Sequence, residues 1–443
     1  MTQKASVSLN LKEILPHRYK TLKVLGKGSY GVVIECLDRK SRENMAIKIA
    51  RPGKTVQREA SILQLLMDIR LDRDNIVKFY GRSSSDRYLV FEMLDINLSQ
   101  YYKAHGRMRL QDIRLVIQQL ASAFDALKIV GVIHGDVKLD NIMLVDRGKQ
   151  PFTVKLIDFS VALSRAEAKK VKMRQVAYFR APEIILRLRY FEAIDIWSLG
   201  VVIVKMVLGI FPFMRSTDYD LLECMIGVLG LPPDNILKAG KTTRQFFNKT
   251  DLGQWIFKTR KEYSVESNDT ISSKIYSLEE MRKVGSSKIS SFVKLNAIDC
   301  PSIPKPDSRW NQMFPERDNE VDDFFKLLNA MFKWDQKKRI TPSRILRHPF
   351  IRGSYLYNSP KLGLTQGPNQ TSKRTCRKKK CTMKHVHKGC RCAVGSPHNI
   401  VDKHPFKTKK MHCIKRLFCW MKDKLLLEDA VGHMVPNIQS LTS

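Results

Sequence analysis

One short polar segment, residues 133–144, holds the side chains with the clearest chemical potential. Asp136 can accept or orient a hydroxyl proton, and Lys138, two residues later, can neutralise a phosphate. Asn141 can offer its amide oxygen to Mg²⁺, a hard cation that prefers oxygen ligands. A polar loop built from turn-forming Asp and Asn residues has the same composition, so this segment alone does not identify a reaction.

Two earlier stretches complement this segment. The glycine turn 26–31 has three glycines between apparent strands, where backbone N–H groups can approach a phosphate without obstruction by side chains. Seventeen residues later, Lys48 lies in an apolar strand, where an ammonium is costly unless it finds a partner. Glu59, in the helical pattern that follows, is the partner we predict. An ordinary hairpin and two solvated charges remain the alternative interpretation.

A third carboxylate, Asp158, stands at the end of the apolar run 154–157. A carboxylate at this point either caps the next segment or binds a metal ion. The segments 181–183, Ala-Pro-Glu, and 195–200, beginning with Asp195, follow in order.

The elements that must position these residues change in character along the chain. Strands are predicted at 21–25, 32–37, 45–49 and 87–93, with a helix around Ile62 and Leu66. From about residue 110 the apolar spacing becomes helical, with short strands at 142–145 and 154–157. A β-rich start before a mostly helical remainder predicts an α+β protein with two lobes.

The order and spacing of these motifs resemble those of the eukaryotic protein kinase family, across about residues 17–352. The resemblance implies a bilobal fold in which Asp136 is the catalytic base, Lys138 assists it, and Asn141 and Asp158 hold Mg²⁺. It implies an apolar spine of Leu63, His134 and Phe159, and a Glu183–Arg339 ion pair. The residues that it assigns to ATP are Leu25, Gly26, Lys27, Gly28, Ser29, Tyr30, Gly31, Val33, Ala46, Lys48, Glu59, Phe91, Glu92 and Met93.

Within that family, residues 179–186, 192–200 and 240–248 resemble the homeodomain-interacting protein kinases, in the dual-specificity tyrosine-regulated branch of the CMGC group. The resemblance implies phosphorylation of Ser or Thr in regulatory proteins, often transcriptional regulators. It also implies a location in the nucleus, the cytoplasm or both. The predicted organisation is a leader at 1–16, an N-lobe at about 17–94, a C-lobe at about 95–352 with a group-specific insert at about 232–314, and a tail at 353–443.

Several positions depart from the family pattern. Ser160 replaces the glycine after Asp158-Phe159, and its Cβ restricts the backbone. Leu139 and Asp140 replace the usual Pro-Glu, which we expect to matter little. Met173 stands where the branch has a self-phosphorylated tyrosine, and Gly135 lacks the usual arginine, as the branch also does. We therefore expect an activation segment held mainly by packing. The changes leave a nucleotide-binding pseudokinase scaffold as the alternative function.

Ala177 replaces an arginine that the group associates with a preference for proline after the target residue. We do not extend that preference to this chain.

Charge and cysteine content add a different kind of evidence. The 443 residues carry 78 Lys+Arg against 43 Asp+Glu, a formal charge of +35, which favours acidic partners. No secretory signal or membrane span is predicted, so the nine cysteines should be reduced in the cytosol or nucleus. The apolar stretch 199–214 is predicted to be a buried helix.

The tail permits several interpretations. Its cysteines and histidines around 376–392 could bind Zn²⁺, although free thiols fit their spacing better. The basic runs 377–380 and 407–410 fit a nuclear import signal, nucleic-acid binding or merely a solvated charged tail. The charge of the tail could also attract an acidic partner. Residues 414–427 could form a basic amphipathic helix that packs on the kinase body, a partner or a membrane.

Overall fold

The computed structural model describes residues 14–28, 30–54, 56–149, 152–209, 211–213, 217–267 and 318–353. The chain divides into two units, residues 1–356 and 357–443, and all described residues belong to the first. The predictions for the leader up to residue 13, Ser29, the 268–314 part of the insert and the tail from residue 354 fall outside the described residues.

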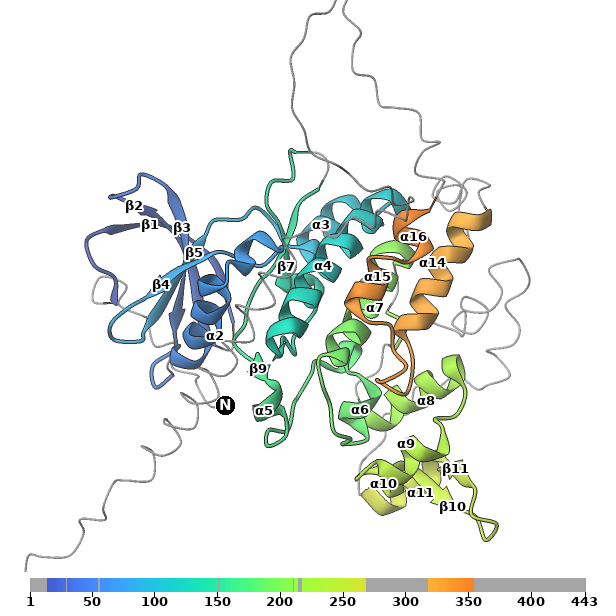
Figure 1. The fold of residues 1–443 in the computed structure, drawn as a ribbon. Coiled ribbons are helices and arrows are strands. Elements are labelled where there is room, and N and C mark those ends of the chain that lie inside the picture. Colours follow the sequence, from blue (N-terminus) through green and yellow to red (C-terminus); the bar gives the residue numbers. More distant parts are fainter. Residues whose placement is uncertain are drawn as a thin grey trace, which may run out of the picture. The chain divides into compact units, whose positions relative to one another are not determined.

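A five-stranded antiparallel sheet and one helix form the N-lobe (Figure 1). The strands follow the order β1-β2-β3-β5-β4 and comprise β1 (Tyr19–Lys27), β2 (Gly31–Asp38), β3 (Asn44–Ala50), β5 (Tyr88–Glu92) and β4 (Phe79–Arg82). Helix α2 (Gln57–Asp68) buries Glu59, Ala60, Leu63 and Leu66, which recur at the spacing of one helical face. All four strands predicted in this lobe are present. The unpredicted β4 is a four-residue edge strand that contains Gly81.

The larger lobe is built around two buried helices, α4 (Leu110–Val130) and α7 (Ala193–Leu208). In α7, 14 of 16 residues are buried, which confirms the buried helix predicted from the apolar run 199–214 for its first part only. The helix ends at Leu208, because Gly209 takes the left-handed conformation, and the described residues 211–213 are not helical. No described helix is long and apolar enough to cross a membrane. Within the described ranges, the other helices of four or more residues are α3 (Leu98–His105), α5 (Arg165–Ala168), α6 (Pro182–Ile185), α8 (Asp218–Leu229), α9 (Asp234–Ala239), α10 (Thr243–Phe246), α11 (Arg260–Ser267), α14 (Asp318–Met331), α15 (Pro342–Ile345) and α16 (Pro349–Arg352).

Two small antiparallel ladders frame the polar segment. Strand β6 (Val132–Ile133) pairs with β9 (Leu163–Ser164), and β7 (Ile142–Leu144) pairs with β8 (Val154–Leu156). A third ladder, β10 (Phe247–Lys249) with β11 (Trp255–Phe257), lies in the described part of the insert. Since β6 and β7 flank residues 134–141 and β8 and β9 flank residues 157–162, the ladders hold both candidate carboxylates, Asp136 and Asp158, beside each other.

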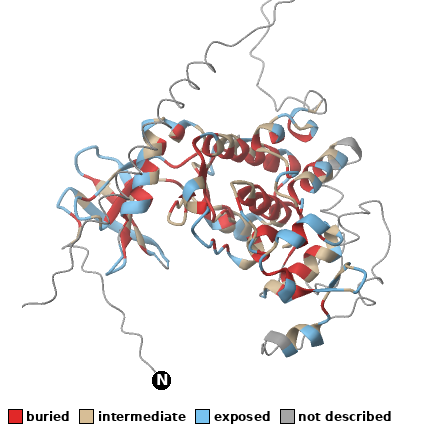
Figure 2. Cartoon of the chain, turned by 60° about the horizontal axis from the view of Figure 1, so that its bottom comes forward, coloured by how far each residue is buried: buried red, intermediate tan, exposed pale blue. Residues whose placement is uncertain are grey.

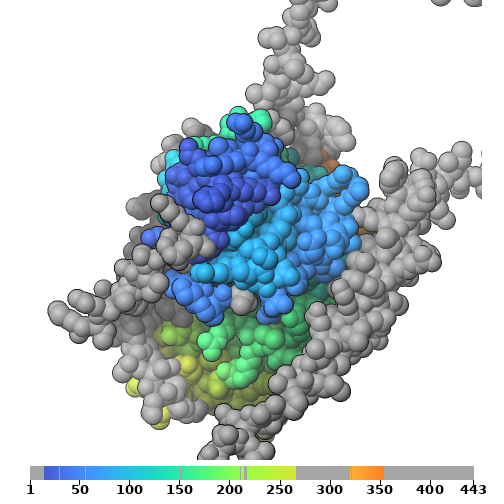
Figure 3. Space-filling model, turned by 90° about the vertical axis from the view of Figure 1, so that its left-hand side faces the viewer, coloured from blue at the N-terminus to red at the C-terminus, as the bar shows by residue number. Residues whose placement is uncertain are grey.

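The most buried residues lie in the centre of the larger lobe. Figure 2 shows buried residues concentrated in the central helices of the larger lobe, with exposed residues on the outer elements. In Figure 3 the blue N-lobe residues lie above the green residues of the larger lobe. The lobes are joined near Ile76, which bridges Leu156 of β8, and the Val77 N–H donates to the Leu156 carbonyl at 3.0 Å.

Candidate active site

The polar segment closes into a compact hydrogen-bonded group around Asp136. The Lys138 ammonium lies 2.7 Å from Asp136 Oδ2, and Asn141 Nδ2 donates to the same oxygen at 2.9 Å. Asn141 Nδ2 also donates to the Asp136 carbonyl at 2.8 Å. Both side-chain contacts use Oδ2, so Oδ1 is the carboxylate oxygen left to face an incoming hydroxyl.

Asp195, a buried residue in the first turn of α7, binds the backbone at the start of the polar segment 133–144. Its carboxylate accepts the backbone N–H groups of His134 and Gly135, each at 2.8 Å. Burial raises the pKa of Asp195 to about 6, against the His134 charge and these two hydrogen bonds. The motif that contains Asp195 is recognisable in the sequence, but this role of Asp195 was not predicted. The available signal was a carboxylate inside an otherwise apolar helix.

The predicted apolar spine is buried in the structure. Leu63, His134 and Phe159 are each at most 1% exposed, and the His134 and Phe159 rings meet edge to face with centroids 4.9 Å apart. His134 Nε2 contacts the Ile157 carbonyl at 2.9 Å. This ring contact links the residue two before Asp136 to the residue after Asp158, and Leu63 of α2 belongs to the same buried cluster as Phe159.

Lys48 bridges the two lobes. Its ammonium lies 2.8 Å from both carboxylate oxygens of Glu59 and 2.7 Å from Asp158 Oδ1. Burial lowers the pKa of Lys48, but the two carboxylates outweigh burial and the net pKa is raised. Burial raises the pKa of Glu59, while Lys48 opposes this. Sequence reasoning predicted the Lys48–Glu59 pair. The second carboxylate on Lys48 emerges only from the fold.

Asp158 keeps its charge despite its surroundings. Burial raises its pKa, but the Lys48 ammonium outweighs burial, and the pKa lies below the ordinary value. Its φ of 62° is left-handed, a conformation that Asp tolerates better than most residues. Ser160 is not among the described residues with a positive φ, so the restriction expected from its Cβ does not strain the backbone here.

The donor set fits a hard divalent cation. Asp158 supplies a charged carboxylate, and Asn141 uses its amide nitrogen for Asp136, which leaves the amide oxygen for a cation. The described residues contain no group of three His, Cys, Asp or Glu side chains that could hold a metal ion. This arrangement matches Mg²⁺, which binds through one or two protein ligands together with substrate phosphates.

The glycine turn has the open geometry that a phosphate needs. A Cβ built on Gly26 or Gly28 meets nothing within 4 Å, so the backbone is accessible at both positions. Gly31 is needed for another reason, since a Cβ there would lie 1.8 Å from the Ile49 carbonyl oxygen in β3. The Tyr30 ring lies over Lys48, with the ammonium 5.8 Å from the ring centroid.

The other residues assigned to ATP lie along the same sheet. Val33 pairs with both Lys48 and Gly26, and Ala46 pairs with Phe91. Leu25 lies at an irregularity between β1 and β2, and Lys27 ends β1.

Glu92 ends β5, and Met93 begins the connection to the larger lobe. Glu92 Oε1 accepts from Lys155 Nζ and from the Lys78 N–H, each at 2.5 Å. This contact of Glu92 with Lys155 of β8 was not predicted.

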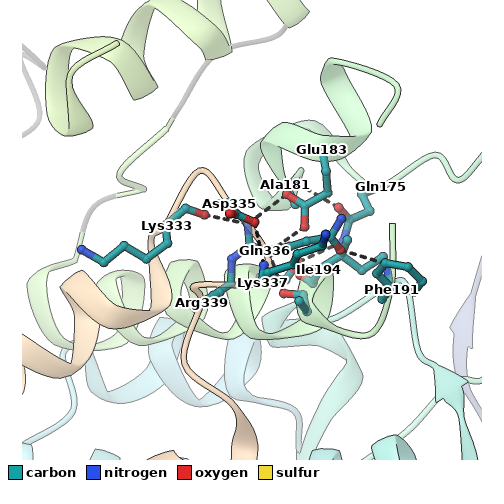
Figure 4. Close-up of polar contacts among 12 residues, drawn as sticks. Gln175, Ala181, Glu183, Phe191, Ile194, Lys333, Asp335, Gln336, Lys337 and Arg339 are labelled. Carbon is teal, nitrogen blue, oxygen red and sulfur yellow. Dashed lines mark hydrogen bonds and ion pairs between the residues drawn. The ribbon is translucent and has the colours of Figure 1, made fainter. Parts of the chain in front are cut away.

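A buried ion pair braces the larger lobe. Glu183 and Arg339 are both 0% exposed, and the guanidinium spans both carboxylate oxygens at 2.7 and 2.9 Å (Figure 4). Arg339 also donates to the carbonyls of Ala193 at 2.7 Å and Lys333 at 2.9 Å. The pairing matches the one implied by the family resemblance.

The activation segment packs directly on the residue beside the candidate base. Gly135 has φ 78°, and a Cβ there would lie 2.5 Å from Met173 Cε and 3.0 Å from Met173 Sδ. The Met173 side chain therefore fills the space that a side chain at position 135 would take. Gly135 and Met173, which both depart from the family pattern, are therefore in contact in the structure.

Comparison with known proteins agrees with this geometry. Residues 19–351 match the model of the protein kinase domain. The chain is 36% identical to mouse homeodomain-interacting protein kinase 1 over 357 residues, 78% of this chain and 28% of that protein. It is 31% identical to human homeodomain-interacting protein kinase 4 over 352 residues, 75% of this chain and 55% of that protein.

Mouse homeodomain-interacting protein kinase 2 is 36% identical over 357 residues, 78% of this chain and 29% of that protein. The chain thus spans less than a third of the length of kinases 1 and 2. The predicted resemblance to these kinases is confirmed, and with the kinase-domain match over three quarters of its length, the chain belongs to the protein kinase family.

Proposed function

We propose that this chain is a serine/threonine protein kinase that transfers the γ-phosphoryl group of ATP, with Mg²⁺, to protein hydroxyls. The observation that supports this proposal is the presence of two polar clusters in a chain of the protein kinase family. Lys48 pairs with Glu59 and Asp158. Asp136 pairs with Lys138 and accepts a hydrogen bond from Asn141. Lys138 supports Ser/Thr specificity, because tyrosine kinases have a different loop at this point.

The roles follow from the contacts. Lys48, held by Glu59, binds the α- and β-phosphates, and the open backbone at Gly26 and Gly28 covers them. Asn141 and Asp158 hold Mg²⁺, which when bound neutralises charge on the phosphate oxygens.

Asp136 Oδ1 accepts the proton of the substrate hydroxyl. The hydroxyl oxygen bonds to the γ-phosphorus, while the bond between the γ-phosphorus and the oxygen of the ADP leaving group breaks. Lys138 keeps Asp136 oriented and offsets the negative charge of the transferring group.

The geometry of the site does not favour the alternative function, a pseudokinase scaffold that binds nucleotide without transferring phosphate. Every residue that the reaction needs is present among the described positions, and Ser160 leaves Asp158 able to hold a cation.

Regulatory proteins, including transcriptional regulators, are the substrates that we propose by analogy with the homeodomain-interacting relatives. We propose the nucleus as the main location on the same ground, and an acidic partner for the tail.

The test is phosphate transfer from γ-labelled ATP, by the full chain, to a test protein with accessible Ser and Thr residues and to the chain itself. Asp136→Asn and Asp158→Asn should each lose at least about 100-fold in rate, the usual effect of removing a group acting in the transition state. Asp140→Asn is the matched control, since it is an exposed carboxylate of the same loop and should retain activity. Label on Ser or Thr is expected. A wild type no faster than Asp136→Asn would refute the proposal, and nucleotide-induced thermal stabilisation would then favour the scaffold.

A further inference from the structure

The activation segment between α5 and the helix η3 (Ala177–Phe179) has an alternating pattern of burial. Met173 and Gln175 are buried, while Lys172, Arg174 and Val176 are exposed. This two-residue period is that of an extended chain whose side chains point alternately to opposite sides. One row of side chains therefore faces the protein, and the other faces outward.

The inward row anchors the segment next to the candidate base. Met173 occupies the space beside Gly135, the neighbour of Asp136. Gln175 Nε2 donates to Ser198 Oγ at 3.1 Å, and its Oε1 accepts the Ala181 N–H at 2.9 Å. The Gln175 side chain is labelled in Figure 4. These contacts determine the position of the outward row relative to Asp136.

The exposed side of the segment is strongly basic. We define the basic strip as Lys169 and Lys170, in the turn that ends α5, together with Lys172 and Arg174 of the outward row, all of which are exposed. None of the four forms an ion pair with any described residue. The carboxylate nearest in sequence, Glu167, is already engaged by Arg58 at 3.2 Å and by the Ser164 N–H at 2.7 Å. The strip is thus a concentration of uncompensated positive charge beside the site of transfer.

The chemistry of the strip favours a peptide over a nucleic acid. Residues 169–176 include no aromatic side chain on which a base could stack, and exposed Val171 and Val176 add apolar surface. Outward side chains two residues apart on an extended segment are separated by about 6.6 Å, and an extended peptide repeats its own side chains at the same spacing. Acidic residues at alternate positions of a substrate would match Lys172 and Arg174.

We propose that the basic strip binds an acidic segment of the protein substrate, so that hydroxyls flanked by Asp or Glu are preferred. The proposal deepens the kinase function above and rests on it. It concerns the residues around the acceptor, and it replaces the preference for proline that Ala177 argues against.

The experiment measures kcat/KM of the full chain for two serine peptides. One has Asp or Glu at alternate positions on both sides of the serine, and the other has Asn or Gln at the same positions. The wild type should prefer the acidic peptide about fivefold, the size expected for two solvent-exposed ion pairs. The preference should fall towards one as ionic strength rises to about 1 M, where charges more than about 3 Å apart are screened.

The double variant Lys172→Gln/Arg174→Gln should bring the ratio of the two kcat/KM values close to one. The matched control is Arg39→Gln/Lys40→Gln, which removes two exposed charges at the β2–β3 turn and should keep the fivefold ratio. The ratio is insensitive to a general loss of activity. Wild type that phosphorylates both peptides equally, or a double variant that keeps the preference, would overturn the inference while leaving the kinase proposal intact. Absence of transfer to either peptide would instead count against the kinase proposal.

Discussion

The Glu183–Arg339 pair allows a sharp test of how the larger lobe is held together. Replacing Arg339 by Met removes the positive charge and leaves the Glu183 carboxylate 0% exposed without its guanidinium. Breaking a buried pair by removing one partner costs about 3–5 kcal/mol. A folded domain has only about 5–15 kcal/mol in total. At about 2.1 cal/mol/K of unfolding entropy per residue, a kinase domain of this size should lose about 4–7 °C of melting temperature in differential scanning calorimetry of the full chain.

Two further variants make this expectation refutable. Arg165 also spans both carboxylate oxygens of a glutamate, Glu192, but its side chain is 41% exposed. Arg165→Met should cost less than about 1 kcal/mol, because water and salt screen that pair. The double variant Glu183→Gln/Arg339→Met should regain part of the loss, since it leaves no unpaired buried charge. Equal effects of Arg339→Met and Arg165→Met would refute the argument from burial.

Three smaller predictions concern other parts of the kinase domain. The buried Ser160 Oγ has no hydrogen-bond partner among the described residues, so Ser160→Ala should raise the unfolding free energy by about 1 kcal/mol, and a lower midpoint in urea would contradict this. The Arg18 guanidinium holds the pKa of Asp38 well below its ordinary value of 3.8. The stability that this pair contributes is present above pH 3.8 and is lost as the pH falls further. Arg18→Gln should therefore make the melting temperature fall less steeply as the pH is lowered below about 4. Met173→Ala and Gly135→Ala should each lower the free energy of unfolding. Because the two residues are in contact, the double variant should lose at least about 0.5 kcal/mol less than the sum of the two single losses. Strictly additive losses in the same urea titration would refute the contact.

The features that sequence predicted best are those with a local cause. Apolar alternation and helical spacing located β1, β2, β3, β5, α2 and α4 within a few residues. The site residues were predictable because the motif order carries their relative positions, which no single motif does. Edge strand β4 was missed since four residues, one of them Gly81, give too short an alternation to detect.

Contacts made only by the fold were beyond the sequence. Asp195 reaches the backbone of His134 and Gly135 across 60 residues, and Lys155 reaches Glu92 across 63. Nothing in the local pattern distinguishes Asp195 from a residue that merely begins a helix. Its role depends on the buried N–H groups that it satisfies, and these are visible only once α7 is packed under the polar segment.

Gly135 and Met173 illustrate a deeper limit of reading substitutions one at a time. In sequence they are two separate departures from the kinase pattern, and together they predicted an activation segment held mainly by packing. In the fold they form a single contact, because the space vacated at Gly135 is the space that Met173 occupies. An apolar contact needs no phosphate to form, so the segment can hold its extended course without modification. Lys172 and Arg174 lie exposed on either side of the buried Met173, and these are the side chains that we propose select the substrate.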